Sequence, residues 1–184
     1  MAQPNLQLLQ LLLTKQVRSH SRKPIIVMTL DIHVRAAFSK EDSLIAEHFY
    51  QMWLDNDVPP NSIQTDWFNI TLEFIDRARK QLCYQAFVAE VDRRVVGSVS
   101  CQLFAGLYPH ILTAEYRQYG YIWGVYVEPN HRRQGIAKQL TTTAVNYLKS
   151  QGCTKAILHA SPSGLPVYSS LGFSPTNEMK LDLI

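Results

Sequence analysis

The sequence of 184 residues predicts one α/β (α+β) domain, in which helices flank a mixed central sheet. Two patterns lead to this prediction. Residues 84–103 alternate apolar and polar side chains on both sides of Asp92-Arg93, which is typical of an antiparallel hairpin. Residues 121–159 read as strand, helix and strand, which is typical of two parallel strands joined by a helix. A sheet that contains both units is mixed.

The first 27 residues are expected to stand apart from a domain that covers residues 28–184. Leu6, Leu9 and Leu13 share one helical face, so this leader is predicted to be an amphipathic helix or else disordered. Its apolar stretch is too short to span a bilayer, and it lacks the basic start and cleavage site of a signal peptide. No membrane span is therefore expected.

Two helices are predicted between a first strand at Ile32–Ala36 and the hairpin. Ser39 is expected to begin the first helix, with Asp42 three residues later as a variant of the capping box. Pro59-Pro60 ends this helix, because proline cannot donate a backbone hydrogen bond. Apolar residues at helical spacing place the second helix at about Thr65–Gln81.

After the hairpin, residues 104–120 contain glycine, proline and several tyrosines and are predicted to be an irregular loop, a kind of segment that often has a function. A strand at Tyr121–Val127 follows. The next helix is indicated by apolar residues at a spacing of four and ends near Gly152. The last predicted elements are a strand at Lys155–His159, a short helix at Leu165–Leu171 and a strand at Glu178–Leu183.

Composition argues against several kinds of function. The first 30 residues carry four positive charges, more than the net charge of +3 of the whole chain. The remaining residues are therefore nearly neutral together, and nucleic-acid binding is not expected. The three cysteines lack paired spacing, which favours reduced thiols and a cytoplasmic protein. The six histidines are scattered singly, so no metal site is expected, and His48 is interpreted as a packed side chain.

The most informative segment is residues 125–137, in which a strand meets a proline, a basic turn, a glycine and a helix. A helix N-terminus has unpaired N–H groups and a partial positive charge, and Arg132, Arg133 and Lys138 lie beside this one. Gly135 has no Cβ and lets an anion approach the backbone. The P-loop and dinucleotide fingerprints are both absent. The segment therefore predicts another kind of phosphate or pyrophosphate site.

Arg132-x-x-Gly135-x-Ala137 resembles the acyl-CoA signature (Q/R)-x-x-G-x-(G/A) of the GNAT superfamily of N-acetyltransferases. Gly164-Leu-Pro-Val-Tyr168, followed by Leu171-Gly-Phe173, resembles the end of many GNAT domains, and the predicted order of elements over about residues 30–184 is that of the GNAT fold. The resemblance implies a sheet that splays between its fourth and fifth strands, with the pantetheine arm of acetyl-CoA in the gap.

The resemblance also implies roles for individual residues. The backbone N–H of Val125 would stabilise the oxyanion, and Tyr168 would protonate the leaving thiolate or else only pack against the cofactor arm. Acetyl-CoA is the implied co-substrate. Its expected contacts are Val125, Tyr126 and Val127 along the strand, Arg132, Arg133, Gln134, Gly135, Ile136, Ala137 and Lys138 around the pyrophosphate, and Tyr168.

The general base stays open. Ungapped counting from Arg132 places Tyr121 where histone-type GNAT enzymes have a glutamate, and a neutral tyrosine is a poor base. Glu115, His110, Glu128 and a water relay are alternatives. Five aromatic residues could line an acceptor pocket or belong to the core: Tyr108, Tyr116, Tyr119, Tyr121 and Trp123.

Two functions are compatible with these residues. The first is acetyl-CoA-dependent N-acetyl transfer to a primary amine, on a small molecule or a peptide, by direct attack in a ternary complex. The alternative is a GNAT-fold acyl-CoA sensor or interaction module without turnover. The acceptor stays open, because acceptor pockets in this fold are formed by variable loops. The oligomeric state, with a homodimer as one possibility, stays open as well.

Overall fold

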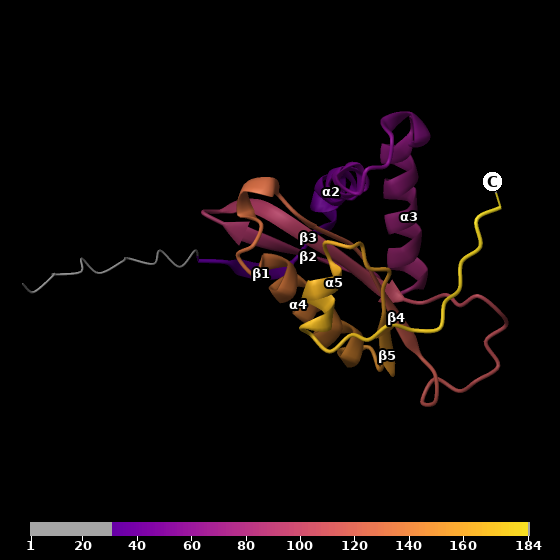
Figure 1. Ribbon diagram of the computed structural model, residues 1–184. Helices are drawn as coiled ribbons and strands as arrows, with labels where there is room; N and C mark the ends of the chain where they lie inside the picture. The colour runs from indigo at the N-terminus through magenta and orange to yellow at the C-terminus, as the bar shows by residue number, and fades with distance from the viewer. Residues whose placement is uncertain (1–30, 184) are drawn as a thin grey trace, which may run out of the picture.

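The computed structural model describes residues 31–183 (Figure 1), so the predicted leader at residues 1–27 lies outside the described residues. The elements in chain order are β1 (His33–Ala36), the 3₁₀ helix η1 (Ser39–Glu41), α2 (Asp42–Asp55), η2 (Pro60–Ser62), α3 (Trp67–Gln81), β2 (Gln85–Val91), β3 (Arg94–Leu103), β4 (Tyr119–Val127), η3 (Pro129–His131), α4 (Ile136–Ser150), β5 (Lys155–Ile157) and α5 (Leu165–Ser169).

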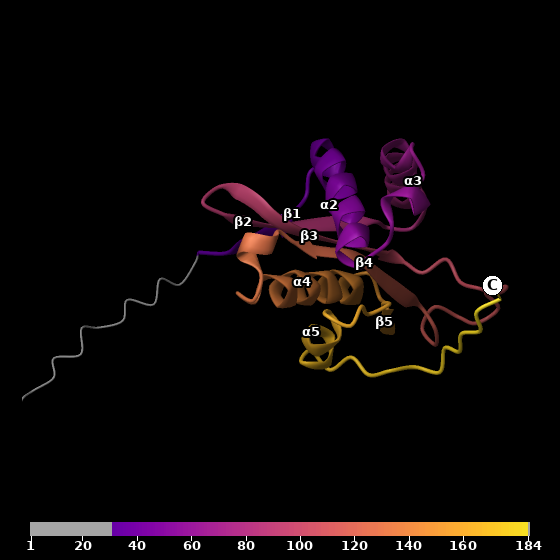
Figure 2. The ribbon, with the colours of Figure 1, turned by 45° about the horizontal axis from the view of Figure 1, so that its top comes forward.

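The five strands form one sheet in the order of the chain. β1 to β4 pair antiparallel, whereas β5 runs parallel to β4, so the predicted mixed sheet is confirmed. Helices α2 and α3 cover one face of the sheet, and α4 covers the other with α5 beside it (Figures 1 and 2). The β4–α4–β5 unit provides the predicted parallel connection.

Each face of the sheet has its own apolar core. On the α4 side, Leu140 and Leu148 pack against Ile122 and Val99, and all four side chains are buried. On the other side, buried residues of α2, α3 and β2 form the second cluster. The predicted spacing of four along α4 is confirmed, because it places one stripe of the helix against the sheet.

A capping box lies at the start of η1, which leads into α2, one residue earlier than the sequence predicts. The Glu41 carboxylate accepts a hydrogen bond of 2.8 Å from the backbone N–H of Phe38. The expected box between Ser39 and Asp42 is therefore wrong. Asp42 instead accepts a hydrogen bond of 2.6 Å from Arg79, which ties α2 to α3.

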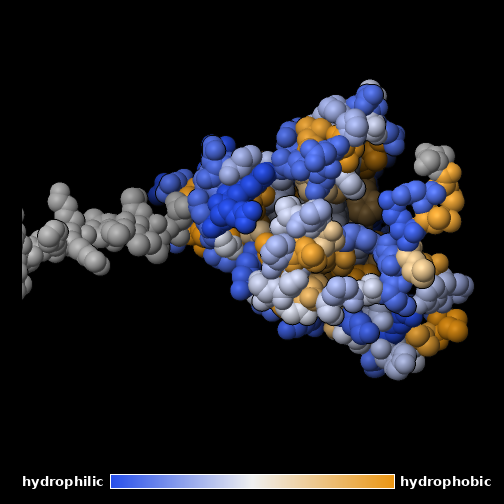
Figure 3. Space-filling view, viewed as in Figure 1, coloured by the Kyte–Doolittle hydropathy of each residue, from blue (hydrophilic) through white to orange (hydrophobic). Residues whose placement is uncertain are grey.

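The predicted strand at Glu178–Leu183 is wrong. Residues 174–183 are irregular, and within residues 31–183 they pair with no strand. The alternation of apolar and charged residues favours an extended backbone, but a strand also needs a partner edge. Met179, Leu181 and Leu183 are consequently exposed, and Figure 3 shows hydrophobic residues projecting from this end of the molecule.

Three element boundaries differ from the predicted ones by two residues. β5 ends at Ile157 and α5 ends at Ser169, each two residues before the predicted boundary, while β4 begins two residues earlier than predicted.

Among residues 31–183, no helix has the length and apolar character needed to cross a membrane.

His48 of α2 is a packed side chain, as the sequence indicates. It is buried, its Nδ1 lies 2.9 Å from the Ser98 hydroxyl, and its ring centroid lies 4.8 Å from that of Tyr126. Burial lowers the pKa of His48 from 6.5 to about 4, and the charge of Glu128 offsets only part of this effect. The side chain is therefore neutral at pH 7.

We expect His48 to make the fold sensitive to mild acid. Between pH 6.5 and pH 4 the unfolded chain binds a proton at this histidine that the folded chain does not, so the free energy of unfolding should fall as the pH falls. The loss should reach about 3 kcal/mol at most. Glu41 should contribute mainly below this window, since Arg35 lowers the pKa of its carboxyl to about 2.

Urea unfolding of the parent and of His48→Gln, at pH values from about 7.5 to 4.5, measures this effect. Glutamine does not titrate, so the variant should show a flatter dependence in that window even though it is less stable at neutral pH. Parallel curves for the two proteins would contradict the assignment to His48.

Candidate functional site

The sheet opens between β4 and β5. The two strands pair only from Tyr119 with Lys155 to Tyr121 with Ile157, whereas β4 continues as far as Val127. Beyond Tyr121, within the described residues, β4 has a neighbour on its β3 side alone. The splay that the sequence resemblance implies between the fourth and fifth strands is therefore confirmed.

The open edge of β4 presents backbone hydrogen-bonding groups. Glu128 donates its N–H to the Val96 carbonyl on β3 over 2.8 Å. Successive residues of a strand direct their backbone groups to opposite sides, so Val127, and by alternation Val125, direct theirs toward the opening. The carbonyl of Val127 indeed accepts a hydrogen bond from a side chain outside the sheet, at 2.8 Å. An extended ligand that contains amides fits such an edge.

A β-bulge at Gly124 sets the direction of the side chains along this edge. β4 pairs through Tyr126 with Ser98 and through Trp123 with Ser100, so β4 has one residue more than β3 between the two pairs. Gly124 has a φ of 62°, a left-handed conformation that glycine adopts at little cost. Because of the bulge, Trp123 packs with the α2–α3 cluster while Val125 packs with the α4 cluster.

The turn after β4 leads directly to the N-terminus of α4. Gly135 is the residue before the helix and has a φ of 82°, and an added Cβ there would meet no atom within 4 Å. Gly135 accepts a hydrogen bond from Gln139, but no described side chain caps the first N–H groups of the helix. The free N–H groups of the first turn, together with the helix dipole, favour a bound anion here.

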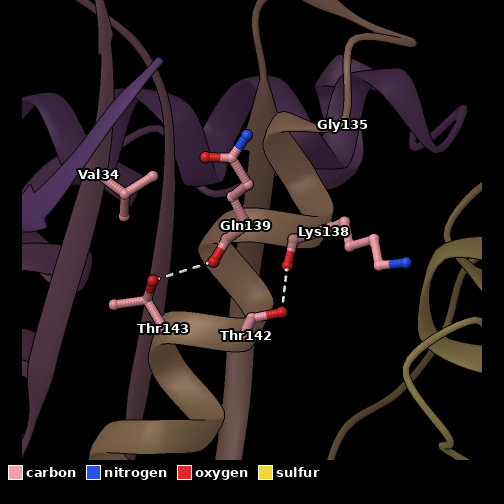
Figure 4. Close-up of a pocket in the computed structure, with 6 residues that line it drawn as sticks. All are labelled: Val34, Gly135, Lys138, Gln139, Thr142 and Thr143. Atoms are coloured by element: carbon pink, nitrogen blue, oxygen red, sulfur yellow. Dashed lines mark hydrogen bonds between the residues drawn. The ribbon is translucent and has the colours of Figure 1, made fainter.

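A surface groove of about 460 Å³ lies at this helix end (Figure 4). Residues of β1 and of the first two turns of α4 line it: Val34, Gly135, Lys138, Gln139, Thr142 and Thr143. Figure 4 shows the side chain of Gln139 on the β1 side of the helix and that of Lys138 on the α5 side. Lys138 adds a positive charge to the N-terminal end of α4.

Tyr168 lies on α5, on the α4 side of the sheet. Its side chain is buried, and its ring centroid lies 6.1 Å from that of Phe173, which packs against the α4 core. Burial raises the pKa of Tyr168 above 10, so its phenol is protonated at neutral pH. A protonated phenol can donate a proton to a nearby anion.

This combination of an open strand edge and an uncapped helix end agrees with the comparison to known families. The model of the acetyltransferase (GNAT) family matches residues 41–173. The chain belongs to the GNAT acetyltransferase family. The predictions of the GNAT fold and of an N-acetyltransferase are thereby confirmed.

Two relatives show how far this GNAT chain resembles other members. Glucosamine 6-phosphate N-acetyltransferase of Trypanosoma brucei brucei is 34% identical over 108 residues, which cover 58% of this chain and 70% of the relative. Human N-acetyltransferase 8 is 30% identical over 117 residues, which cover 62% of this chain and 47% of the relative. The chain thus spans about half the length of the human protein.

Solved structures agree with the fold. The structure of a predicted acetyltransferase with acetyl-CoA, from Clostridium acetobutylicum, has a TM-score of 0.70 and 27% identity, and the match covers 83% of this chain and 96% of that one. A GCN5-related N-acetyltransferase from Ralstonia eutropha has a TM-score of 0.68 and 25% identity, with coverages of 83% and 98%. Both matches extend well beyond the signature turn.

Arg132, which opens the GNAT signature, is directed away from the helix end. Its Nε donates to the Val127 carbonyl over 2.8 Å, and its guanidinium pairs with the Asp55 carboxylate at the end of α2. Its backbone N–H bonds to the Pro129 carbonyl over 3.3 Å. In this structure Arg132 braces the turn against α2, a contact between distant segments that the sequence pattern does not indicate.

The three sequence candidates for the general base are each held by other groups. The Glu128 carboxylate pairs with Arg94 at 3.0 Å, and the His110 ring lies 3.0 Å from the Arg117 carbonyl within the exposed loop. Hydrogen bonds from its own N–H and from Thr113 lower the pKa of Glu115, which makes it a weaker base. The described residues also contain no cluster of side chains that could hold a metal ion.

The sequence analysis missed a chain of three hydrogen-bonded side chains beside the opening. The Tyr121 hydroxyl lies 2.8 Å from Nδ1 of His159, and Nε2 of His159 lies 3.0 Å from the Glu178 carboxylate. Sequence reasoning treated His159 as one of the scattered histidines. Its place at the end of the strand predicted at Lys155–His159, which is expected to splay from its neighbour, is the signal that could have indicated it.

The aromatic residues divide between core and surface. Trp123 packs edge-on against Phe49 and Phe74, with ring centroids 5.2 and 5.4 Å away, and is part of the α2–α3 core. Tyr108 and Tyr116 are exposed in the irregular loop before β4. The opening itself is therefore bordered by Tyr121 rather than by the whole aromatic set.

Proposed function

We propose that this GNAT protein transfers the acetyl group of acetyl-CoA to a primary amine by direct attack in a ternary complex. One observation carries the proposal: the open edge of β4 leads, through the turn at residues 128–135, to the uncapped N-terminus of α4. The amides of a pantetheine arm can bond to such an edge, and a pyrophosphate can bind at such a helix end.

The residues proposed to hold acetyl-CoA follow from this geometry. The backbone of β4 would bond the pantetheine arm, and Tyr168 would lie beside it from α5. Arg132 would contribute by holding the turn rather than by contacting phosphate, since its side chain is bonded elsewhere. The proposed contacts are Val125, Tyr126, Val127, Arg133, Gln134, Gly135, Ile136, Ala137, Lys138 and Tyr168.

The proposed chemistry needs an oxyanion donor and a proton for the leaving thiolate. The N–H of Val125, next to the bulge, is proposed to stabilise the negative charge that develops on the thioester oxygen. Tyr168 is proposed to protonate the departing thiolate, and its raised pKa keeps that proton available at neutral pH. The N–H of Val125 is directed along the sheet toward the opening, and Tyr168 lies on α5 beside α4.

The acceptor is proposed to be a small-molecule or peptide amine, and glucosamine 6-phosphate is the first candidate because the trypanosomal relative is named for it. The protein is proposed to work in the cytoplasm, which agrees with its three free thiols. A free-thiol release assay with amino sugars, polyamines and peptides tests turnover. Acetyl-CoA binding without thiol release from any amine would favour the alternative, a sensor module without turnover.

We expect Gly135→Asp to weaken acetyl-CoA binding by about 100-fold or more, equivalent to roughly 2.7 kcal/mol. The new carboxylate would occupy the position proposed for the pyrophosphate and repel it. Gly135→Asn is the matched control, because asparagine is nearly the same size, is uncharged and also tolerates the left-handed φ of 82°. Calorimetry with equal affinities for the two variants would overturn the placement of the pyrophosphate.

We expect Tyr168→Phe to lower kcat by about 10²–10⁴-fold, the usual contribution of a general acid. The affinity for acetyl-CoA should change little, because the ring keeps its packing against Phe173. Steady-state kinetics and calorimetry measure the two quantities. A variant with normal kcat and a higher KM for acetyl-CoA would instead assign the hydroxyl to substrate binding.

A further inference from the structure

Three side chains from separate segments form a continuous hydrogen-bonded chain where the sheet begins to open. Tyr121 belongs to β4, His159 follows β5 and Glu178 belongs to the C-terminal segment. We propose that these residues form the proton relay that deprotonates the acceptor amine. This proposal rests on the proposed N-acetyltransferase function and names the base that the sequence leaves open.

The position of the chain suits this role. Tyr121 is the last residue of β4 that pairs with β5, and His159 lies two residues beyond its partner Ile157. Both therefore lie where the two strands separate. Residues of β4 alternate in direction, so Tyr121 lies on the same side as Trp123, toward α2 and α3, whereas Ile122 packs on the α4 side.

The relay and Tyr168 thus lie on opposite sides of the sheet opening, since α5 packs beside α4 (Figure 2). This arrangement suits a direct transfer. The amine must lose a proton on one side of the thioester carbon, while the thiolate gains one on the other side. With separate groups on the two sides, neither group has to serve both steps.

The hydrogen bonds also define the direction of proton flow. A carboxylate can only accept, so Nε2 of His159 carries the hydrogen that binds Glu178, and Nδ1 accepts from the Tyr121 hydroxyl. The lone pairs of the phenol oxygen are then free to accept an amine N–H. Burial, and secondarily the charge of Glu178, raise the pKa of Tyr121, so its phenol keeps its proton until the histidine takes it.

The groups around the relay favour proton transfer from Tyr121 to His159. Glu178 is the charged partner of His159, and Tyr121 is its other hydrogen-bonding partner. The Phe104 ring, whose centroid lies 6.0 Å from that of Tyr121, adds no charge. An imidazolium formed at His159 would therefore face a carboxylate that stabilises it.

The proposed step balances in protons and electrons. An ammonium acceptor gives one proton to the Tyr121 oxygen while the phenol gives its own proton to Nδ1 of His159. The neutral amine then forms the C–N bond and the C–S bond breaks. Tyr168 gives its proton to the departing thiolate, and the nitrogen then gives its remaining proton, through water, to the Tyr168 phenolate, which restores the phenol. His159 finally releases its proton to water, to which its side chain is 65% exposed.

A contribution to folding stability does not by itself explain these hydrogen-bonded side chains. The side chains of His159 and Glu178 are 65% and 70% exposed, and exposed ion pairs contribute little to folding because water screens them. The protein contains a matched pair for comparison. His33 is 69% exposed, and its Nδ1 lies 3.8 Å from the Glu90 carboxylate. That pair lies on β1 and β2, away from the opening.

The test measures kcat for the parent, His159→Ala, His159→Gln, Tyr121→Phe and the control His33→Ala, with the best acceptor of the amine panel and saturating acetyl-CoA. We expect kcat to fall by about 10²–10⁴-fold in both His159 variants and in Tyr121→Phe, and to be unchanged in the control. Glu178→Gln should lose about 10-fold, as expected for a positioning residue. Calorimetry should give the affinity of the parent for acetyl-CoA in every variant.

Two further readouts separate a lost base from a structural change. The acid limb of the parent's pH profile of kcat should disappear in His159→Gln, which keeps a hydrogen-bonding side chain but does not titrate. Added imidazole should restore part of the activity of His159→Ala, because the position is open to solvent. A parent-like kcat and pH profile in both His159 variants would overturn the relay alone. A parent that releases no thiol with any amine would overturn the proposed function together with the relay.

Discussion

The separation of β4 from β5 is the constraint on which the rest of this structure depends. β5 ends at Ile157, the partner of Tyr121, whereas β4 continues as far as Val127 without a described strand on that side. Backbone groups left without partners are costly unless water or a ligand satisfies them. α4 packs on one face of β4 and α2 on the other, so the strand is held in the fold without β5 beside it.

Helix α4 couples this opening to the proposed anion site. Its buried stripe, which includes Leu140 and Leu148, fixes the helix against the sheet, and its position fixes the N-terminus at the end of β4. The bulge at Gly124 turns Val125 toward the same side. Arg132 then ties the intervening turn to α2 through Asp55. Core packing on one face of the sheet therefore positions the groups proposed to bind acetyl-CoA.

Local patterns in the sequence predict most of the fold and the signature turn, because the hairpin, the β4–α4–β5 unit and Gly135 depend on neighbours in the chain. The sequence predictions fail where contacts between distant segments determine the structure. The strand predicted at Glu178–Leu183 has no partner edge, and Arg132 bonds to Asp55 rather than facing the helix end. The contact of Tyr121 with His159 joins residues 38 positions apart, which no local pattern indicates.

Amide hydrogen exchange tests most directly the central claim that the open edge of β4 and the N-terminus of α4 form one acetyl-CoA site. With saturating acetyl-CoA, the amides of Val125 and Val127 and those of residues 136–138 should exchange more slowly. The amides of Tyr119–Tyr121, which lie where β4 and β5 pair with or without ligand, should not change. Slower exchange elsewhere in the domain, with none at these two places, would contradict the account.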